Sequence, residues 1–227
     1  MATGGTIAGV APDAQRPDHY ESAVLTADVL LASLPQSVGA SQLLSGLDLS
    51  TEQIAQVDSK DMTHALWRTL AQRCAQLLDD PLIDGVVITH GTDTVEETAF
   101  FLHCVLRAQK PVALTCAMRP ANAPDADGPA NLLDALLWVA HTAQPQVAVV
   151  VHGQAHAATA VQKVWSHRCD AFSSGAHAPV ALIQAGLVQE TALTQGNLNA
   201  AKIQPAKPEP WPAPHVSALP EASDWPD

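Results

Sequence analysis

The stretch Gly85–Thr98, GVVITHGTDTVEET, constrains the fold most, because it joins a strand to a helix through a polar turn. Val86–Ile88 form a β-branched run, which is typical of a buried strand. Thr94 and Glu97 have the spacing of a capping box at a helix N-terminus. The residues that follow at helical spacing predict one apolar helix face: Val95, Ala99, Phe100, Leu102, Val105 and Leu106. Thr92 and Asp93 are therefore expected between the end of a strand and the start of a helix, where their alternative role is capping alone.

The same alternation of strands and helices runs through the chain to about residue 152. We expect further strands near 54–57, 112–115, 147–151 and 186–188. Helices are expected to begin at Thr26, Thr63 and Pro129. This order predicts an α/β fold with a doubly wound, mostly parallel sheet and helices on both faces. In such sheets the ligand crevice lies at the carboxyl ends of the strands.

The chain opens on MATGGTIAG, a glycine-rich turn with almost no residues before it to form a strand. Glycines let the backbone adopt positive φ and approach a ligand closely. We therefore expect a truncated first strand and a frayed end at Thr6. At the other end, prolines accumulate from residue 205, and the predicted division is an α/β domain over 1–192 and a Pro-rich linker or tail over 193–227.

The composition limits the classes of partner. A net charge of −12 argues against nucleic acid, which is bound mainly through Lys and Arg. No apolar run approaches the roughly 20 residues of a membrane span, and no signal peptide precedes the first motif, so the sequence as written predicts a cytoplasmic protein. The four cysteines show no CxxC spacing and lie in apolar surroundings, which favours buried reduced thiols over disulfides or a metal site.

Five motifs in this order resemble the bacterial-type L-asparaginase/glutaminase family: TGGTIAG at 3–9, DSKDMT at 58–63, ITHGTDTVEETAFFL at 88–102, AMRP with DADGPANL within 117–132, and Lys163 with DAF at 170–172. The resemblance covers roughly residues 1–190. It implies hydrolysis of L-asparagine, and often L-glutamine, to the acid and ammonia, without a cofactor or metal. It also implies that the family's C-terminal domain is absent from this sequence, and it leaves a homo-oligomer open.

The resemblance implies two groups of catalytic residues. Thr6 would be the nucleophile, activated with the help of Tyr20 on a mobile loop. Thr92, Asp93 and Lys163 would form a second cluster. Such an arrangement follows the nucleophile–base–orienter logic of covalent catalysis. Whether Tyr20 or the Thr92–Lys163 pair deprotonates Thr6 stays open from the sequence.

The substrate-binding roles are also implied by the family. Ser59 would hold the substrate's α-carboxylate and Asp93 its α-amino group, while the carbonyl next to Ala117 would meet the side-chain amide. Lys60 stands where many relatives carry an uncharged residue, and it either assists binding near the α-carboxylate or faces water.

Two other functions compete with the amidohydrolase. The first is a truncated, non-catalytic amino-acid-binding pseudoenzyme or fragment, suggested by the shortened ends. The second is the related subunit of a tRNA-dependent amidotransferase, which the acidic charge and the abrupt start disfavour.

Overall fold

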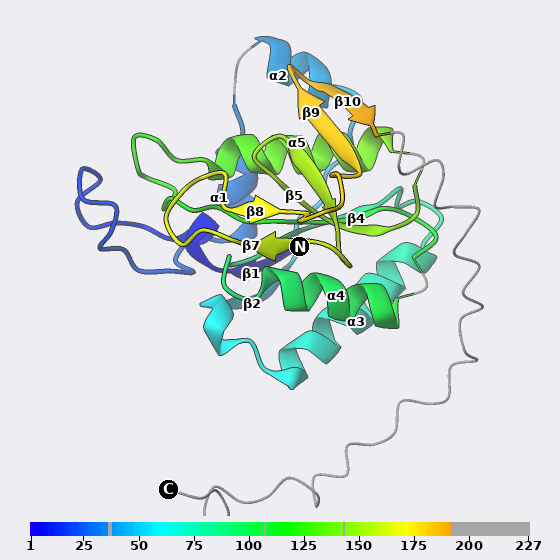
Figure 1. Ribbon diagram of the computed structural model, residues 1–227, viewed down its shortest axis with the longest axis horizontal. Coiled ribbons are helices and arrows are strands. Elements are labelled where there is room, and N and C mark those ends of the chain that lie inside the picture. The colour runs from blue at the N-terminus through cyan, green and yellow to red at the C-terminus, as the bar shows by residue number, and fades with distance from the viewer. Residues whose placement is uncertain (36–37, 107, 143, 192–227) are drawn as a thin grey trace, which may run out of the picture. The chain divides into compact units, whose positions relative to one another are not determined.

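The computed structural model describes residues 1–191 apart from 36–37, 107 and 143 (Figure 1). The tail predicted over 193–227 lies outside the described residues. The helices are α1 Ala27–Ala32, α2 Val38–Leu44, α3 His64–Asp79, α4 Val95–Val105 and α5 Gly128–His141. The strands are β1 Ala2–Gly4, β2 Gln53–Val57, β3 Val86–Thr89, β4 Val112–Thr115, β5 Val147–Val151, β6 Gln154–Ala157, β7 Gln162–Lys163, β8 Phe172–Ser173, β9 Ala181–Gln184 and β10 Leu187–Glu190.

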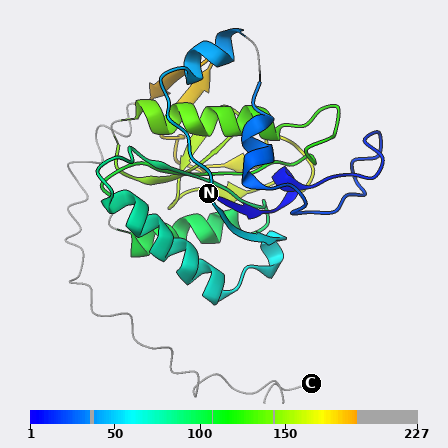
Figure 2. The ribbon, with the colours of Figure 1, turned by 180° about the vertical axis from the view of Figure 1, so that it is seen from behind.

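The main sheet has the order β10-β9-β6-β5-β4-β3-β1-β2 among the described residues. The five strands from β5 to β2 pair in parallel, and α5 covers one face while α3 and α4 cover the other (Figures 1 and 2). Successive side chains of β4 point to opposite faces of the sheet. Leu114 packs in the core under α3 and α4, while Ala113 packs against α5 on the other face. The predicted mostly parallel, doubly wound α/β fold is confirmed.

An antiparallel edge extends this parallel sheet. β5 and β6 form a tight hairpin through His152 and Gly153, whose φ values of 49° and 71° are both positive. β9 and β10 then continue the sheet in antiparallel pairs. β7 and β8 form a separate two-stranded ribbon, which carries Lys163.

The first strand corrects an expectation. Although β1 has three residues, all three are buried, and the strand lies between β2 and β3 in the sheet. The expectation of a frayed end at Thr6 is therefore wrong. Pairing on both sides holds the strand in place despite its length.

Three local expectations around α4 are also wrong. The side chain of Thr94 does not cap the helix; its hydroxyl donates a 2.8 Å hydrogen bond to the carbonyl of Ser59 instead. The buried face of α4 contains Val95, Thr98, Ala99 and Leu102, at helical spacing. Phe100 and Cys104 lie off this face and are exposed, so they are not core residues.

Candidate functional site

Three loops meet at the carboxyl edge of the sheet. Thr6 opens a short 3-10 helix (Thr6–Ala8) after β1, Ser59 opens another (Ser59–Asp61) after β2, and Thr92 follows β3. Parallel neighbours end at the same edge, so the topology brings these residues together.

Glycines allow these loops to approach so closely. Gly5 has φ 81° and ψ −171°, a conformation essentially restricted to glycine. A Cβ on Gly5 would overlap the backbone of Gly91, and a Cβ on Gly91 would overlap the side chain of Ser59. Because neither Gly5 nor Gly91 has a side chain, the Thr6 loop can lie this close to the Thr92 loop.

A cavity of about 260 Å³ opens where the loops meet. Six of the predicted site residues line it: Thr6, Tyr20, Ser59, Thr92, Asp93 and Lys163. Asp18, Asp58, Met118, Arg119, Ser166 and His167 are also among its lining residues. The two threonines, which lie far apart in the sequence, thus share one cavity.

Thr6 and Tyr20 form the first polar pair. Their hydroxyl oxygens lie 2.7 Å apart. Thr6 is buried, whereas Tyr20 keeps 38% of its surface exposed. Two backbone hydrogen bonds between Val10 and Glu21 close the base of the loop that carries Tyr20. Tyr20 is therefore held against Thr6 from the solvent side.

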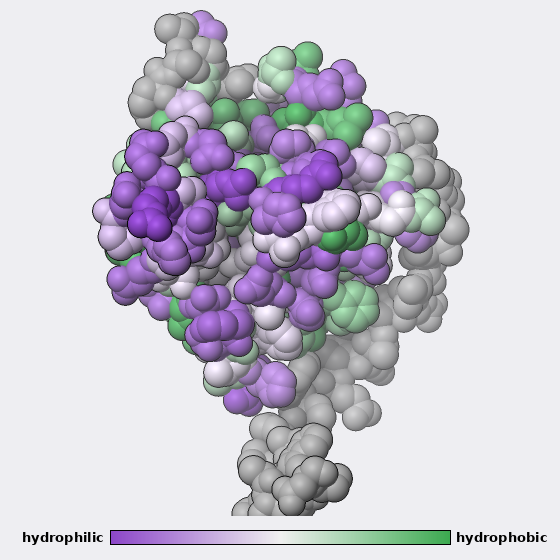
Figure 3. All heavy atoms as spheres, turned by 60° about the vertical axis from the view of Figure 1, so that its left-hand side comes forward, coloured by the Kyte–Doolittle hydropathy of each residue, from purple (hydrophilic) through white to green (hydrophobic). Residues whose placement is uncertain are grey.

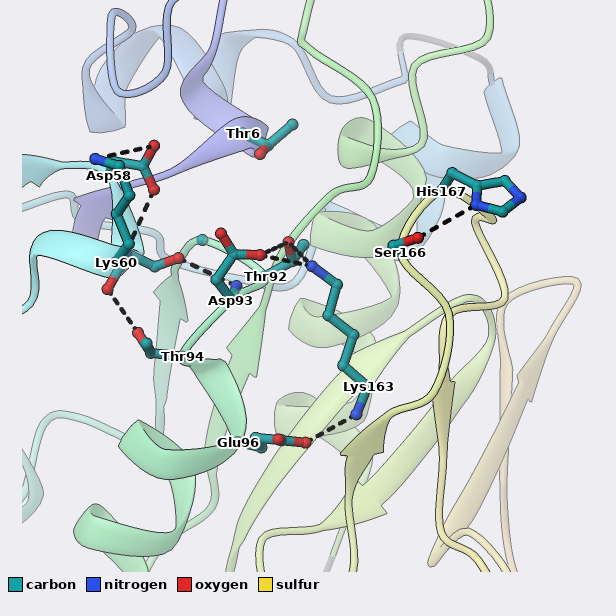
Figure 4. A network of polar contacts seen from close by, with 12 residues as sticks. Thr6, Asp58, Lys60, Thr92, Asp93, Thr94, Glu96, Lys163, Ser166 and His167 are labelled. Atoms are coloured by element: carbon teal, nitrogen blue, oxygen red, sulfur yellow. Dashed lines mark hydrogen bonds and ion pairs between the residues drawn. The ribbon is translucent and has the colours of Figure 1, made fainter. Parts of the chain in front are cut away.

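Thr92, Asp93 and Lys163 form the second cluster (Figure 4). The Lys163 ammonium donates to Thr92 Oγ1 at 2.8 Å and to Asp93 Oδ1 at 2.7 Å. Because the Thr92 oxygen already accepts from Lys163, its own hydrogen is available to a group in the cavity; the 3.4 Å contact with Asp93 Oδ1 is too long to hold it firmly.

Ser59 lines the same cavity, and its hydroxyl can donate a hydrogen bond into it. The backbone N–H of Asp93 donates to Ser59 Oγ at 3.1 Å, so the serine oxygen serves as the acceptor in that contact. Its own hydrogen can then point to an anionic group, such as a carboxylate. Ser59 is also 3% exposed, which makes its hydroxyl a fixed feature of the wall.

A buried polar chain supports the turn before Thr92. The Trp67 indole N–H donates to Thr98 Oγ1 at 2.9 Å, so the Thr98 hydroxyl donates in turn to His90 Nε2 at 3.1 Å. His90 Nδ1 must then carry the hydrogen, and it donates to the Gly91 carbonyl at 2.8 Å. Burial lowers the pKa of His90 to about 4, which keeps this ring neutral near pH 7.

Two predicted substrate-binding residues are not among those lining the cavity. The Lys60 ammonium is exposed and pairs with Asp61 at 2.6 Å. Ala117 is buried, and its neighbours Met118 and Arg119 reach the cavity wall instead. Asp58, Arg119, Ser166 and His167 also line the cavity, although no role was predicted for them from the sequence. Asp58 and Arg119 each come shortly after a strand of the parallel sheet, and this position in the sequence could have predicted that they lie near the ligand crevice.

The side of the molecule with the 10–22 loop is mostly hydrophilic, with small separate hydrophobic patches (Figure 3). Among the described residues, no group of three or more His, Cys, Asp or Glu side chains is placed to hold a metal ion. No helix in this part of the chain has the length and apolar character to cross a membrane.

The cysteines are free thiols in the described residues. Cys74 and Cys116 are buried, as expected, and burial raises the pKa of Cys74 to about 12. Cys169 is half-buried.

Known proteins resemble this chain in sequence and structure. A "Glutaminase-asparaginase" of Acinetobacter glutaminasificans is 42% identical over 136 residues, covering 60% of this chain and 39% of that protein. An "L-asparaginase 2" of Escherichia coli is 38% identical over 151 residues, covering 66% of this chain and 41% of that protein. The chain thus spans about two fifths of these curated relatives.

A solved structure extends the likeness to the fold. A probable cytoplasmic L-asparaginase from Campylobacter jejuni superposes with a TM-score of 0.78 and 41% identity, covering 84% of this chain and 57% of that one. Residues 1–193 match the family described as "Asparaginase, N-terminal". Because this match covers well over half of the chain, the chain belongs to the asparaginase family through its N-terminal domain.

Proposed function

We propose that this chain hydrolyses the side-chain amide of L-asparagine, with L-glutamine as a second candidate substrate, and that Thr6 is the nucleophile. The observation that carries the proposal is the shared cavity, in which the Thr6–Tyr20 pair and the Thr92–Lys163–Asp93 cluster both present hydroxyl groups. At about 260 Å³ the cavity lies just below the roughly 300–1,000 Å³ usual for drug-sized ligands, which suits an amino acid.

Covalent catalysis accounts for the contact between the Thr6 and Tyr20 hydroxyl groups. Thr6 Oγ1 attacks the amide carbon as its proton passes to the Tyr20 oxygen, 2.7 Å away, and the partly exposed Tyr20 releases its own hydroxyl proton to water. The C–N bond then breaks, the nitrogen takes up a proton, and ammonia leaves. Water attacks the resulting ester, the bond to Thr6 breaks, and the hydroxyl is restored together with L-aspartate.

The second cluster polarises the substrate amide and gives a proton to the departing nitrogen. Lys163 donates to Thr92, and the Thr92 hydrogen can be donated in turn to the substrate amide. Ser59 would donate to the α-carboxylate, while Asp93, which is partly exposed at the cavity wall, would accept from the α-ammonium. A hydroxyl donor for the carboxylate and a carboxylate acceptor for the ammonium favour a zwitterionic amino acid over a simple amide.

Ammonia release from L-asparagine and L-glutamine by the purified chain tests the proposal. Thr6→Ala and Thr92→Val are each expected to lower turnover about 10⁴-fold or more. Thr69→Ala, on the exposed side of α3, is the matched control and should keep the wild-type rate.

Calorimetric titration with L-asparagine separates the amidohydrolase from the amino-acid-binding pseudoenzyme. The proposal is wrong if the chain binds L-asparagine without releasing ammonia, or if Thr6→Ala turns over at the wild-type rate.

A further inference from the structure

Lys163 is held outside the main sheet. It lies on β7, a two-residue strand that pairs only with β8 among the described strands. Its ammonium must nevertheless reach Thr92 and Asp93, which are fixed at the end of β3. Whatever fixes the backbone of Lys163 therefore determines how well these contacts form.

Glu96 makes a direct contact with that backbone. Its Oε2 accepts a hydrogen bond from the Lys163 N–H at 2.8 Å, as the lower part of Figure 4 shows. The acceptor is a carboxylate, and charge-assisted hydrogen bonds are roughly twice as strong as neutral ones. The contact joins residues 67 positions apart in the sequence.

The helix that carries Glu96 is a rigid support. Glu96 lies in the first turn of α4, and the neighbouring Val95 and Ala99 are fully buried in the core. The segment leading into β7 also lies against α4, because Glu96, Glu97 and Phe100 line one shallow hollow with residues 158–162. Glu96 is not among the residues that line the catalytic cavity.

We propose that Glu96 is a positioning residue, which sets the reach of the Lys163 ammonium to Thr92 by anchoring the Lys163 backbone to α4. The proposal rests on the proposed function. Glu96 acts through Lys163 and does not touch the substrate, so its removal should lower kcat while KM stays nearly constant.

Four variants separate this role from a general effect on the helix. Glu96→Ala removes the acceptor, Glu96→Asp shortens it by one methylene group, and Glu96→Gln keeps a carbonyl oxygen in place. Glu97→Ala is the matched control, because Glu97 is exposed in the same turn and its loss changes the helix charge by the same amount.

We expect Glu96→Ala and Glu96→Asp to lower kcat about 10- to 100-fold with KM within about twofold, since an error of about 1 Å in a catalytic group has effects of this size. Glu96→Gln should recover most of the rate, and Glu97→Ala should keep it. Equal losses in Glu96→Ala and Glu97→Ala, or no loss in Glu96→Ala and Glu96→Asp, would overturn the proposal.

Hydrogen exchange of the Lys163 amide gives a readout that does not depend on turnover. This amide should exchange at least about tenfold faster in Glu96→Ala than in Glu97→Ala, because only the first variant loses its acceptor. Equal exchange in the two variants would refute the anchoring. If the wild-type chain releases no ammonia, the proposed function fails, and amide exchange alone decides whether Glu96 holds Lys163.

Discussion

Replacing Gly5 with alanine tests the close approach of the Thr6 and Thr92 loops. The backbone of Gly5 has φ 81° and ψ −171°, and holding a non-glycine residue in that region costs about 1–3 kcal/mol. The new Cβ would also overlap the Gly91 backbone, and overpacking of this kind costs about 1–3 kcal/mol more. Gly5→Ala should therefore lower the free energy of unfolding by about 4 kcal/mol, the middle of the summed range.

Two other glycines separate the contributions. Gly175 has a φ of 60° but open space around it, so Gly175→Ala should cost only the left-handed backbone term of about 1–2 kcal/mol. Gly46 also has open space and no positive φ, so Gly46→Ala should be nearly neutral.

Thermal unfolding followed by circular dichroism measures these differences. A loss of 1 kcal/mol lowers Tm by about 2–4 °C in a chain of this size, which gives a fall of about 8–16 °C for Gly5→Ala and about 2–8 °C for Gly175→Ala. A Gly5→Ala variant as stable as Gly175→Ala would refute the argument that the two loops interlock.

Three further predictions follow from the site and its surroundings. Ser59→Ala should raise KM for L-asparagine about tenfold in steady-state assays, because one hydrogen bond to the substrate carboxylate is lost; an unchanged KM would contradict this role. NMR of the imidazole nitrogens should find His90 neutral, with its hydrogen on Nδ1, down to about pH 5. The folded pKa of about 4 lies below the unfolded value, so the unfolded state takes up the proton first, and the free energy of unfolding should fall as pH falls from about 6.5 to 4. Desolvation raises the pKa of Asp134 to about 6, so the wild type should lose unfolding free energy as pH rises from about 4 to 6. Asp134→Asn lacks this titration and should therefore gain stability relative to the wild type across that interval. If the unfolding free energies of the two, measured with urea, change equally between pH 4 and 6, the assignment is contradicted.

The central strand–turn–helix units could be predicted from the sequence. The β-branched run at Val86–Ile88 and the apolar helix face behind it gave β3 and α4 nearly in full. The carboxyl-edge rule then placed Thr92 and Asp93 in the crevice. These features succeeded because they depend on local periodicity and on the general geometry of parallel sheets.

The errors arose where tertiary contacts override local patterns. Thr94 has the sequence of a cap, yet its hydroxyl reaches a carbonyl 35 residues away at Ser59. β1 looked too short for a strand, but neighbours on both sides supply the pairing that length alone cannot. The contact of Glu96 with Lys163 depends on the path of the chain after β6, which local periodicity does not specify.

The structure of the chain with L-aspartate bound tests the central claim most directly. The claim is that Thr6 and Thr92 act on one ligand in one cavity. The ligand's side-chain carboxylate should lie between the two hydroxyl oxygens, within about 2.5–3.0 Å of each. A ligand that contacts only one of the two threonines, or that binds outside this cavity, would contradict the account.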